Sequence, residues 1–76
     1  MTPSIHIGEQ IRKHLVDQKR SIAWLAEHLH HDPSNLRKLL KNAHLPTDLL
    51  FRISKIVEKD FFEGYSLLLA ESTEVG

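Results

Sequence analysis

The apolar residues of this chain recur with the period of an α-helix, and no stretch alternates between apolar and polar residues as a half-buried strand does. Ile7, Ile11 and Leu15, for example, stand four residues apart and therefore share one face of a helix over about residues 7–18. A chain with this period buries its apolar residues by packing helices together. The pattern therefore predicts an all-α fold.

Two strong capping signals mark the starts of the second and third helices. Ser21 is suited to be the N-cap of a helix over about residues 22–29, because its hydroxyl can accept a hydrogen bond from a backbone N–H of the first turn. Asp32 and Pro33 begin a helix over about residues 33–41, since proline has no N–H to leave unpaired at the first helical position.

Further signals place two more helices in the second half of the chain. After a turn over residues 42–46, Thr47 is the expected N-cap of a fourth helix. Asp60 and Glu63 have the spacing of a capping box, which predicts a fifth helix over about residues 61–69. The sequence as a whole thus predicts a compact bundle of five helices.

One domain accounts for the whole chain. Its 76 residues lie near the lower end of what folds unaided, and 41% apolar with 26% charged residues is typical of a globular chain. We expect a single domain, 1–76, with a core over about residues 5–69 and a flexible tail over 71–76. The lack of cysteine excludes disulfides and cysteine-ligated zinc.

No segment of the sequence indicates export or insertion into a membrane. The first residues contain no basic region followed by an apolar stretch, so we expect no signal peptide. The longest apolar run, from Leu67 to Ala70, is far too short to cross a bilayer. The protein is therefore expected to be cytoplasmic and to have no membrane partner.

The charges are distributed unevenly although the formal net charge is zero. Residues 1–45 contain seven Lys and Arg against four Asp and Glu, whereas residues 46–76 contain three against six. A basic half joined to an acidic half is the pattern that a phosphate-binding face on one side of a small domain would produce. Ordinary scatter of surface charge is the alternative interpretation.

The junction between the second and third helices carries the most information about function. Two short helices separated by only three or four residues cross at a steep angle, which requires a small residue at their contact, and Ala26 stands there. The apolar contact between them is expected to come from Leu25, Leu29, Leu36 and Leu39. The N-terminal edge of the third helix then stays exposed to solvent.

The segment from Ser21 to Leu40, SIAWLAEHLHHDPSNLRKLL, resembles the helix-turn-helix of the Cro and lambda-repressor (Xre-like) family. The resemblance extends to the five-helix layout and covers roughly residues 5–66. Ala26 falls on the small-residue position of the motif. His30 stands where the family usually has glycine, at a position that often needs a positive φ.

This resemblance implies a sequence-specific regulator of transcription that binds double-stranded DNA and places its third helix, about Pro33 to Lys41, in the major groove. The family's base-contacting positions fall on Pro33, Ser34 and Lys38, and Arg37 lies beside them within reach of bases or backbone. The resemblance also implies that five further residues contact DNA phosphates, either through main-chain N–H groups at a helix start or through their side chains. These residues are Lys19, Arg20, Ser21, Lys41 and Asn42.

Association of two copies is a further expectation. The last helix is more apolar than one face of a terminal helix needs, and we expect Phe61, Tyr65 and Leu68 to form a homodimer contact. Phe62, Tyr65 and Leu69 are expected to close the core of each copy. A two-fold dimer would hold two recognition helices about one DNA turn apart, roughly 34 Å, and would bind a palindromic site.

A second function from another class stays open: a helical protein-interaction module, antitoxin-like or adaptor, on the same fold with weak or no DNA binding. Zero net charge, Pro33 at a base-reading position and His30 at the turn favour it. Trp24 is expected to be a half-buried packing residue, because binding of single-stranded nucleic acid uses several exposed aromatics.

The sequence contains no motif for catalysis or for a cofactor. It lacks a Gly-x-Ser-x-Gly elbow and a glycine-rich phosphate loop, so we do not expect an enzyme or a pocket for a small-molecule ligand. The six histidines include no pair with the i, i+4 spacing of a helical zinc site. We therefore expect neither a metal nor another cofactor.

Overall fold

The computed structural model describes residues 5–72, and this part of the chain contains five helices joined by turns and loops, with no strand. The helices are α1 (Ile7–Asp17), α2 (Ile22–Leu29), α3 (Pro33–Leu39), α4 (Thr47–Val57) and α5 (Glu63–Ser72). The predicted all-α class and the five helices are therefore confirmed for the described residues.

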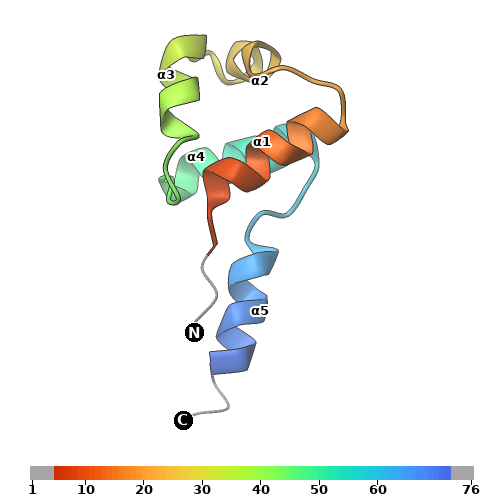
Figure 1. Ribbon diagram of the computed structural model, residues 1–76, viewed down its shortest axis with the longest axis vertical. Coiled ribbons are helices and arrows are strands. Elements are labelled where there is room, and N and C mark those ends of the chain that lie inside the picture. The colour runs from red at the N-terminus through yellow and green to blue at the C-terminus, as the bar shows by residue number, and fades with distance from the viewer. Residues whose placement is uncertain (1–4, 73–76) are drawn as a thin grey trace.

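The first four helices form a body from which α5 projects. α2 packs against both α3 and α4, and Figure 1 shows α2 and α3 above α1 and α4. α5 leaves from the opposite side of this body, so the molecule measures 43 Å along its longest axis but only 23 and 21 Å across. The α2–α3 pair and α5 thus occupy opposite ends of the molecule.

One core joins the four helices of the body, and it follows the helical period of the sequence. Each helix contributes the residues of one face, and the turn before α5 contributes a phenylalanine. The buried apolar side chains are Ile7, Ile11, Leu15, Leu25, Ala26, Leu29, Leu36, Leu40, Leu49, Leu50, Ile53, Val57 and Phe61. Leu39, expected in the contact between α2 and α3, is only partly buried.

The predicted starts of α2 and α3 are confirmed in detail. Ser21 Oγ accepts a hydrogen bond from Trp24 N at 3.0 Å. Asp32 Oδ2 accepts one from Asn35 N at 3.2 Å, and Pro33 is the first helical residue. Each cap satisfies one of the backbone N–H groups that a helix start leaves without an intrahelical partner.

Thr47 is not the N-cap of α4, contrary to our expectation. The cap is Pro46, whose carbonyl accepts the hydrogen bond from Leu50 N at 2.9 Å, and Thr47 is already helical. The fixed φ of proline, here −54°, brings the chain into the helix one residue earlier than a threonine cap would.

The fifth helix begins later and ends later than predicted. Phe61 turns into the core, with 1% of its surface exposed, and Asp60 Oδ1 accepts from Phe62 N at 2.9 Å in a turn that precedes the helix. α5 therefore starts at Glu63. It continues through Ser72, so the predicted tail is helical at its first two residues, and residues 73–76 lie outside the described part.

The prediction that Phe62, Tyr65 and Leu69 close the core at this end was wrong for Tyr65 and Leu69, whereas Phe62 packs against the core. Phe61 is the buried aromatic and packs edge-on against the His14 ring, with 5.9 Å between ring centroids. Phe62 is partly buried, whereas Tyr65 is 37% exposed and Leu69 is 66% exposed. The reason is that α5 points away from the body (Figure 1), so most of this helix lies too far from the core to contribute to it.

His30 adopts the left-handed conformation that the turn between α2 and α3 was expected to require, with φ 59° and ψ 40°. This region costs a non-glycine residue roughly 1–2 kcal/mol, partly offset by the extra chain entropy that glycine loses on folding. We therefore expect His30→Gly to raise the free energy of unfolding by about 0.5–1 kcal/mol, measured by urea denaturation.

The neighbouring residue gives the matched control for this prediction. His31 does not have a positive φ, so His31→Gly only loosens the unfolded chain and is expected to lower stability by about 0.5–1 kcal/mol. An unchanged or lower stability for His30→Gly would show that the His30 side chain makes an interaction that offsets its backbone strain.

Candidate nucleic-acid interface

The outer edge of α3 presents a row of polar and cationic side chains to solvent. Leu36 and Leu40 are buried on the inner face. The helical period turns the residues between them outward. All four predicted base-contacting residues are exposed, namely Pro33, Ser34, Arg37 and Lys38.

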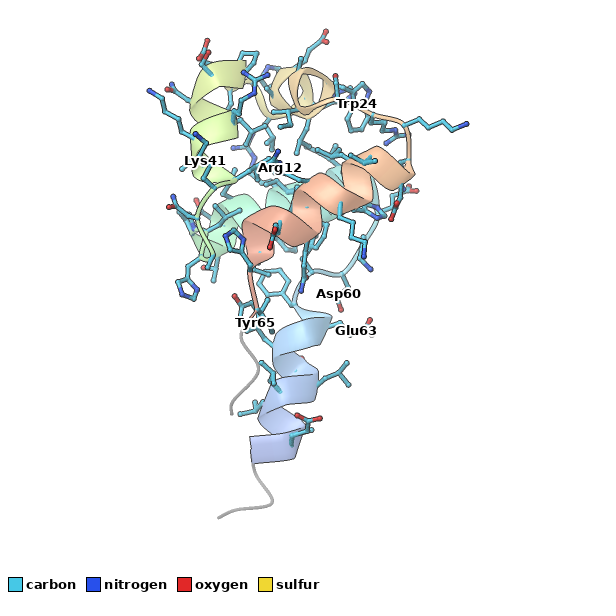
Figure 2. All side chains as sticks on the ribbon, in the orientation of Figure 1. Arg12, Trp24, Lys41, Asp60, Glu63 and Tyr65 are labelled. Carbon is cyan, nitrogen blue, oxygen red and sulfur yellow. The ribbon has the colours of Figure 1, made fainter. Side chains whose placement is uncertain are left out.

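The loop that follows α3 is held in place by backbone hydrogen bonds to the start of α1. Ile7 N donates to Ala43 O at 2.9 Å, and Gly8 N donates to Asn42 O at 3.3 Å. Two N–H groups that the start of α1 would otherwise leave unpaired are thus satisfied by loop carbonyls. The backbone around Lys41 and Asn42 is fixed in this way, while both side chains are exposed. Figure 2 shows Lys41 at the end of α3.

His6 adds a side-chain link between the same two elements. Its Nδ1 accepts a hydrogen bond from Glu9 N at 3.0 Å, which caps α1. Its Nε2 lies 3.1 Å from Lys41 O. Because a carbonyl only accepts, Nε2 carries the proton and donates, and a single neutral tautomer satisfies both bonds. His6 therefore couples the end of α3 to the start of α1.

Gly8 is required by the closeness of this junction and not by its own backbone conformation, since no glycine in the described chain has a positive φ. A Cβ at this position would lie only 1.9 Å from Leu40 O and 2.6 Å from Asn42 O. Both atoms belong to backbone that cannot rotate away. Only a residue without a side chain allows α1 to approach the end of α3 so closely.

The start of α2 has free hydrogen-bond donors beside two cations. Within the described chain, the backbone N–H groups of Ile22 and Ala23 have no acceptor. Lys19 and Arg20 precede them, and both side chains are exposed, as is Ser21. Free N–H groups and the positive end of a helix dipole suit an anion such as a DNA phosphate.

Arg20 is held against the outer face of α2. Its Cζ lies 4.1 Å from the centroid of the Trp24 ring, a cation–π distance, and the Trp24 ring in turn stacks on His28 with 4.3 Å between centroids. Trp24 is partly buried, as expected. Figure 2 places Trp24 on the side of α2 away from α3. This stack limits the directions that the Arg20 guanidinium can take.

A third link, from α4, fixes the end of α2. Arg52 Nη2 donates to Leu29 O at 3.0 Å, across the contact between the two helices. This bond satisfies one of the last carbonyls of α2, which have no partner inside the helix. It steadies the turn over residues 30–32 and therefore the direction in which α3 leaves it.

Sequence reasoning missed the three residues that position this surface. These residues are His6, Gly8 and Arg52, and none of them belongs to a sequence motif. The partner of His6 lies 35 residues away along the chain, those of Gly8 lie 32 and 34 residues away, and that of Arg52 lies 23 residues away. The one signal that could have indicated a role for Gly8 is its place at the start of a predicted helix, because glycine is a poor helix former.

Among residues 5–72, no three His, Asp or Glu side chains come together as ligands for a metal ion. None of the helices in this range has the length and apolar character that crossing a membrane requires. Comparison with family models, curated proteins and solved structures gave no match.

Proposed function

We propose that this protein is a sequence-specific, double-stranded DNA-binding regulator of transcription with a lambda-repressor-like fold, in which α2 and α3 form the helix-turn-helix. The observation that carries the proposal is the exposed edge of α3, with Arg37 and Lys38 turned to solvent while Leu36 is buried. A helix held in this way fits the major groove, where its side chains can reach base edges.

The surroundings of α3 support a clamp on the DNA backbone. Lys41 and Asn42 follow α3 on a loop fixed to α1, and the free N–H groups at the start of α2 lie beside Lys19 and Arg20. Phosphate contacts of this kind set the orientation of the protein, and α3 reads the bases. Pro33 and Ser34 would approach the bases from the first turn of α3.

Salt dependence tests this proposal directly. With three to six phosphates neutralised per monomer, the logarithm of the affinity for a random duplex is expected to fall with the logarithm of salt concentration with a slope of about −3 to −5. Fluorescence anisotropy of a labelled duplex, begun at low salt, measures it. The absence of any binding at low salt would instead favour a protein-interaction module on the same fold.

The apolar surface of α5 favours an interaction with a second copy of the chain. Tyr65, Leu67 and Leu69 are 37%, 60% and 66% exposed on a helix that stands clear of the body (Figures 1 and 2). Tyr65 and Leu68 belong to the predicted dimer contact. Phe61, its third residue, is buried in the core and is therefore not available for a contact with a second copy. Pairing two α5 helices would cover this surface and produce the two-fold arrangement that a palindromic site needs.

Sedimentation velocity tests the dimer. We expect the wild-type chain to sediment as a dimer and the double variant Tyr65→Glu/Leu69→Glu as a monomer, because a charge at each position would have to be buried between the helices. The control is Val16→Glu, which makes the same kind of change at a 72% exposed residue of α1. A dimer that survives the double change would place the interface elsewhere.

A further inference from the structure

A small open hollow of about 170 Å³ lies between α2 and α4, and it is lined by His28, Arg52, Lys55 and Ile56. Every polar side chain in this lining is a cation or a histidine, and no carboxylate takes part. Neither helix supplies the whole site: His28 comes from the last turn of α2, and the other three residues come from α4. No residue of α3 belongs to it.

The polar groups of the hollow are held by contacts outside it. Arg52 uses Nη2 to bind Leu29 O, which fixes the guanidinium and leaves its other N–H donors available. Lys55 Nζ lies 5.6 Å from the centroid of the Phe51 ring, one helical turn earlier on α4. The side chains are therefore partly ordered before any ligand arrives, which lowers the entropy cost of binding.

The charges gathered here have no counterion within the described chain. Arg52 and Lys55 are both cationic, and neither forms an ion pair there. Like charges held close together repel one another, and an anion seated between them would remove that repulsion. The hollow has the volume of about five or six water molecules, enough for one tetrahedral oxyanion and some of its hydration.

We propose that this hollow binds a phosphate-type oxyanion, with Arg52 and Lys55 as the charged donors. The anion is either the phosphate of a free small molecule or a phosphate of a nucleic-acid backbone, since the hollow recognises the same group in both. The proposal goes beyond the proposed function and does not depend on it, because no group of the α3 edge takes part.

His28 lines the hollow without adding a hydrogen-bond donor to it. Its Nδ1 lies 2.9 Å from Trp24 O and must donate to that carbonyl, so in the neutral ring Nε2 has only a lone pair to offer. In that tautomer Nε2 offers no donor, so the donors to an anion are Arg52 and Lys55.

Titration of the full chain with inorganic phosphate at constant ionic strength tests the proposal. The readouts are the backbone and side-chain NMR signals of His28, Arg52 and Lys55, and the fluorescence of Trp24, the single tryptophan, which stacks on His28. We expect saturable changes with a dissociation constant on the order of millimolar.

Lys55→Gln removes one charged donor from an exposed residue and should weaken phosphate binding about tenfold, the effect of one charge-assisted hydrogen bond. Lys13→Gln, the same change on α1, should leave phosphate binding unaltered. If Lys55→Gln also lowers the salt slope of duplex binding, the natural anion is a backbone phosphate. If duplex binding is unchanged or absent, the anion is a free phosphate compound.

Two results would overturn the proposal whatever the chain does with DNA. One is a phosphate titration without saturable changes at His28, Arg52 and Lys55. The other is an equal loss of binding in Lys55→Gln and Lys13→Gln, which would reduce the effect to the overall charge of the protein.

Discussion

The Gly8→Ala variant is expected to melt roughly 10–20 °C below the wild-type protein, which corresponds to a loss of about 2–4 kcal/mol in a domain of this size. The added methyl group would lie 1.9 Å from Leu40 O and 2.6 Å from Asn42 O. Those oxygens belong to backbone, so α1 must move away from the end of α3. The movement breaks the hydrogen bonds from Ile7 N to Ala43 O and from Gly8 N to Asn42 O.

The expected loss of stability in Gly8→Ala is opposite to the usual effect of this substitution in a helix. Glycine in a helix is less favourable than alanine by about 1 kcal/mol, so the same substitution normally stabilises a helix. Gly64 in α5 is the matched control, because its Cβ would meet only the Ile5 Cδ1 atom at 3.3 Å, the far end of a flexible side chain. We expect Gly64→Ala to be neutral or to raise stability by up to about 1 kcal/mol.

Thermal unfolding followed by circular dichroism measures both glycine variants. A melting temperature for Gly8→Ala equal to or above that of the wild-type protein would show that α1 does not approach the end of α3 as described. Because the same junction fixes Lys41 and Asn42, Gly8→Ala should also weaken duplex binding at temperatures where the variant is still folded.

Reversing the charge of Arg37 and Lys38 together is expected to lower the affinity for duplex DNA by at least about 100-fold at low salt. Each substitution by glutamate removes an attraction to DNA and adds a repulsion. Both side chains are exposed. The double variant should therefore keep the wild-type melting temperature, which separates loss of binding from loss of fold.

The control for overall charge is Lys13→Glu/Lys59→Glu. These two lysines lie on α1 and just after α4 and not on α3, and the double variant changes the net charge by the same amount. Anisotropy titrations over a series of salt concentrations should show a shallower salt slope for the α3 variant and a nearly unchanged slope for the control. Equal losses in the two variants would mean that α3 makes no specific contact with DNA.

Interactions between residues close together in the sequence were sufficient to predict the helices of the body and which residues of α3 are exposed. Ser21 and Asp32 cap their helices as predicted because a cap depends on atoms only three residues apart. The period of the apolar residues likewise decided which side of α3 is buried and which is turned to solvent. His30 was correctly expected to have a positive φ.

Tertiary structure alone decided how these helices are joined and where α5 points. Three contacts that join the helices involve atoms far apart in the chain. They are the close approach of Gly8 to the end of α3, the hydrogen bond from His6 to Lys41 O and the hydrogen bond from Arg52 to Leu29 O. The burial of Phe61 in place of Tyr65 and Leu69 depends on the direction in which α5 leaves the body. Capping and periodicity act within one or two helical turns, whereas such contacts exist only after separate helices have packed together.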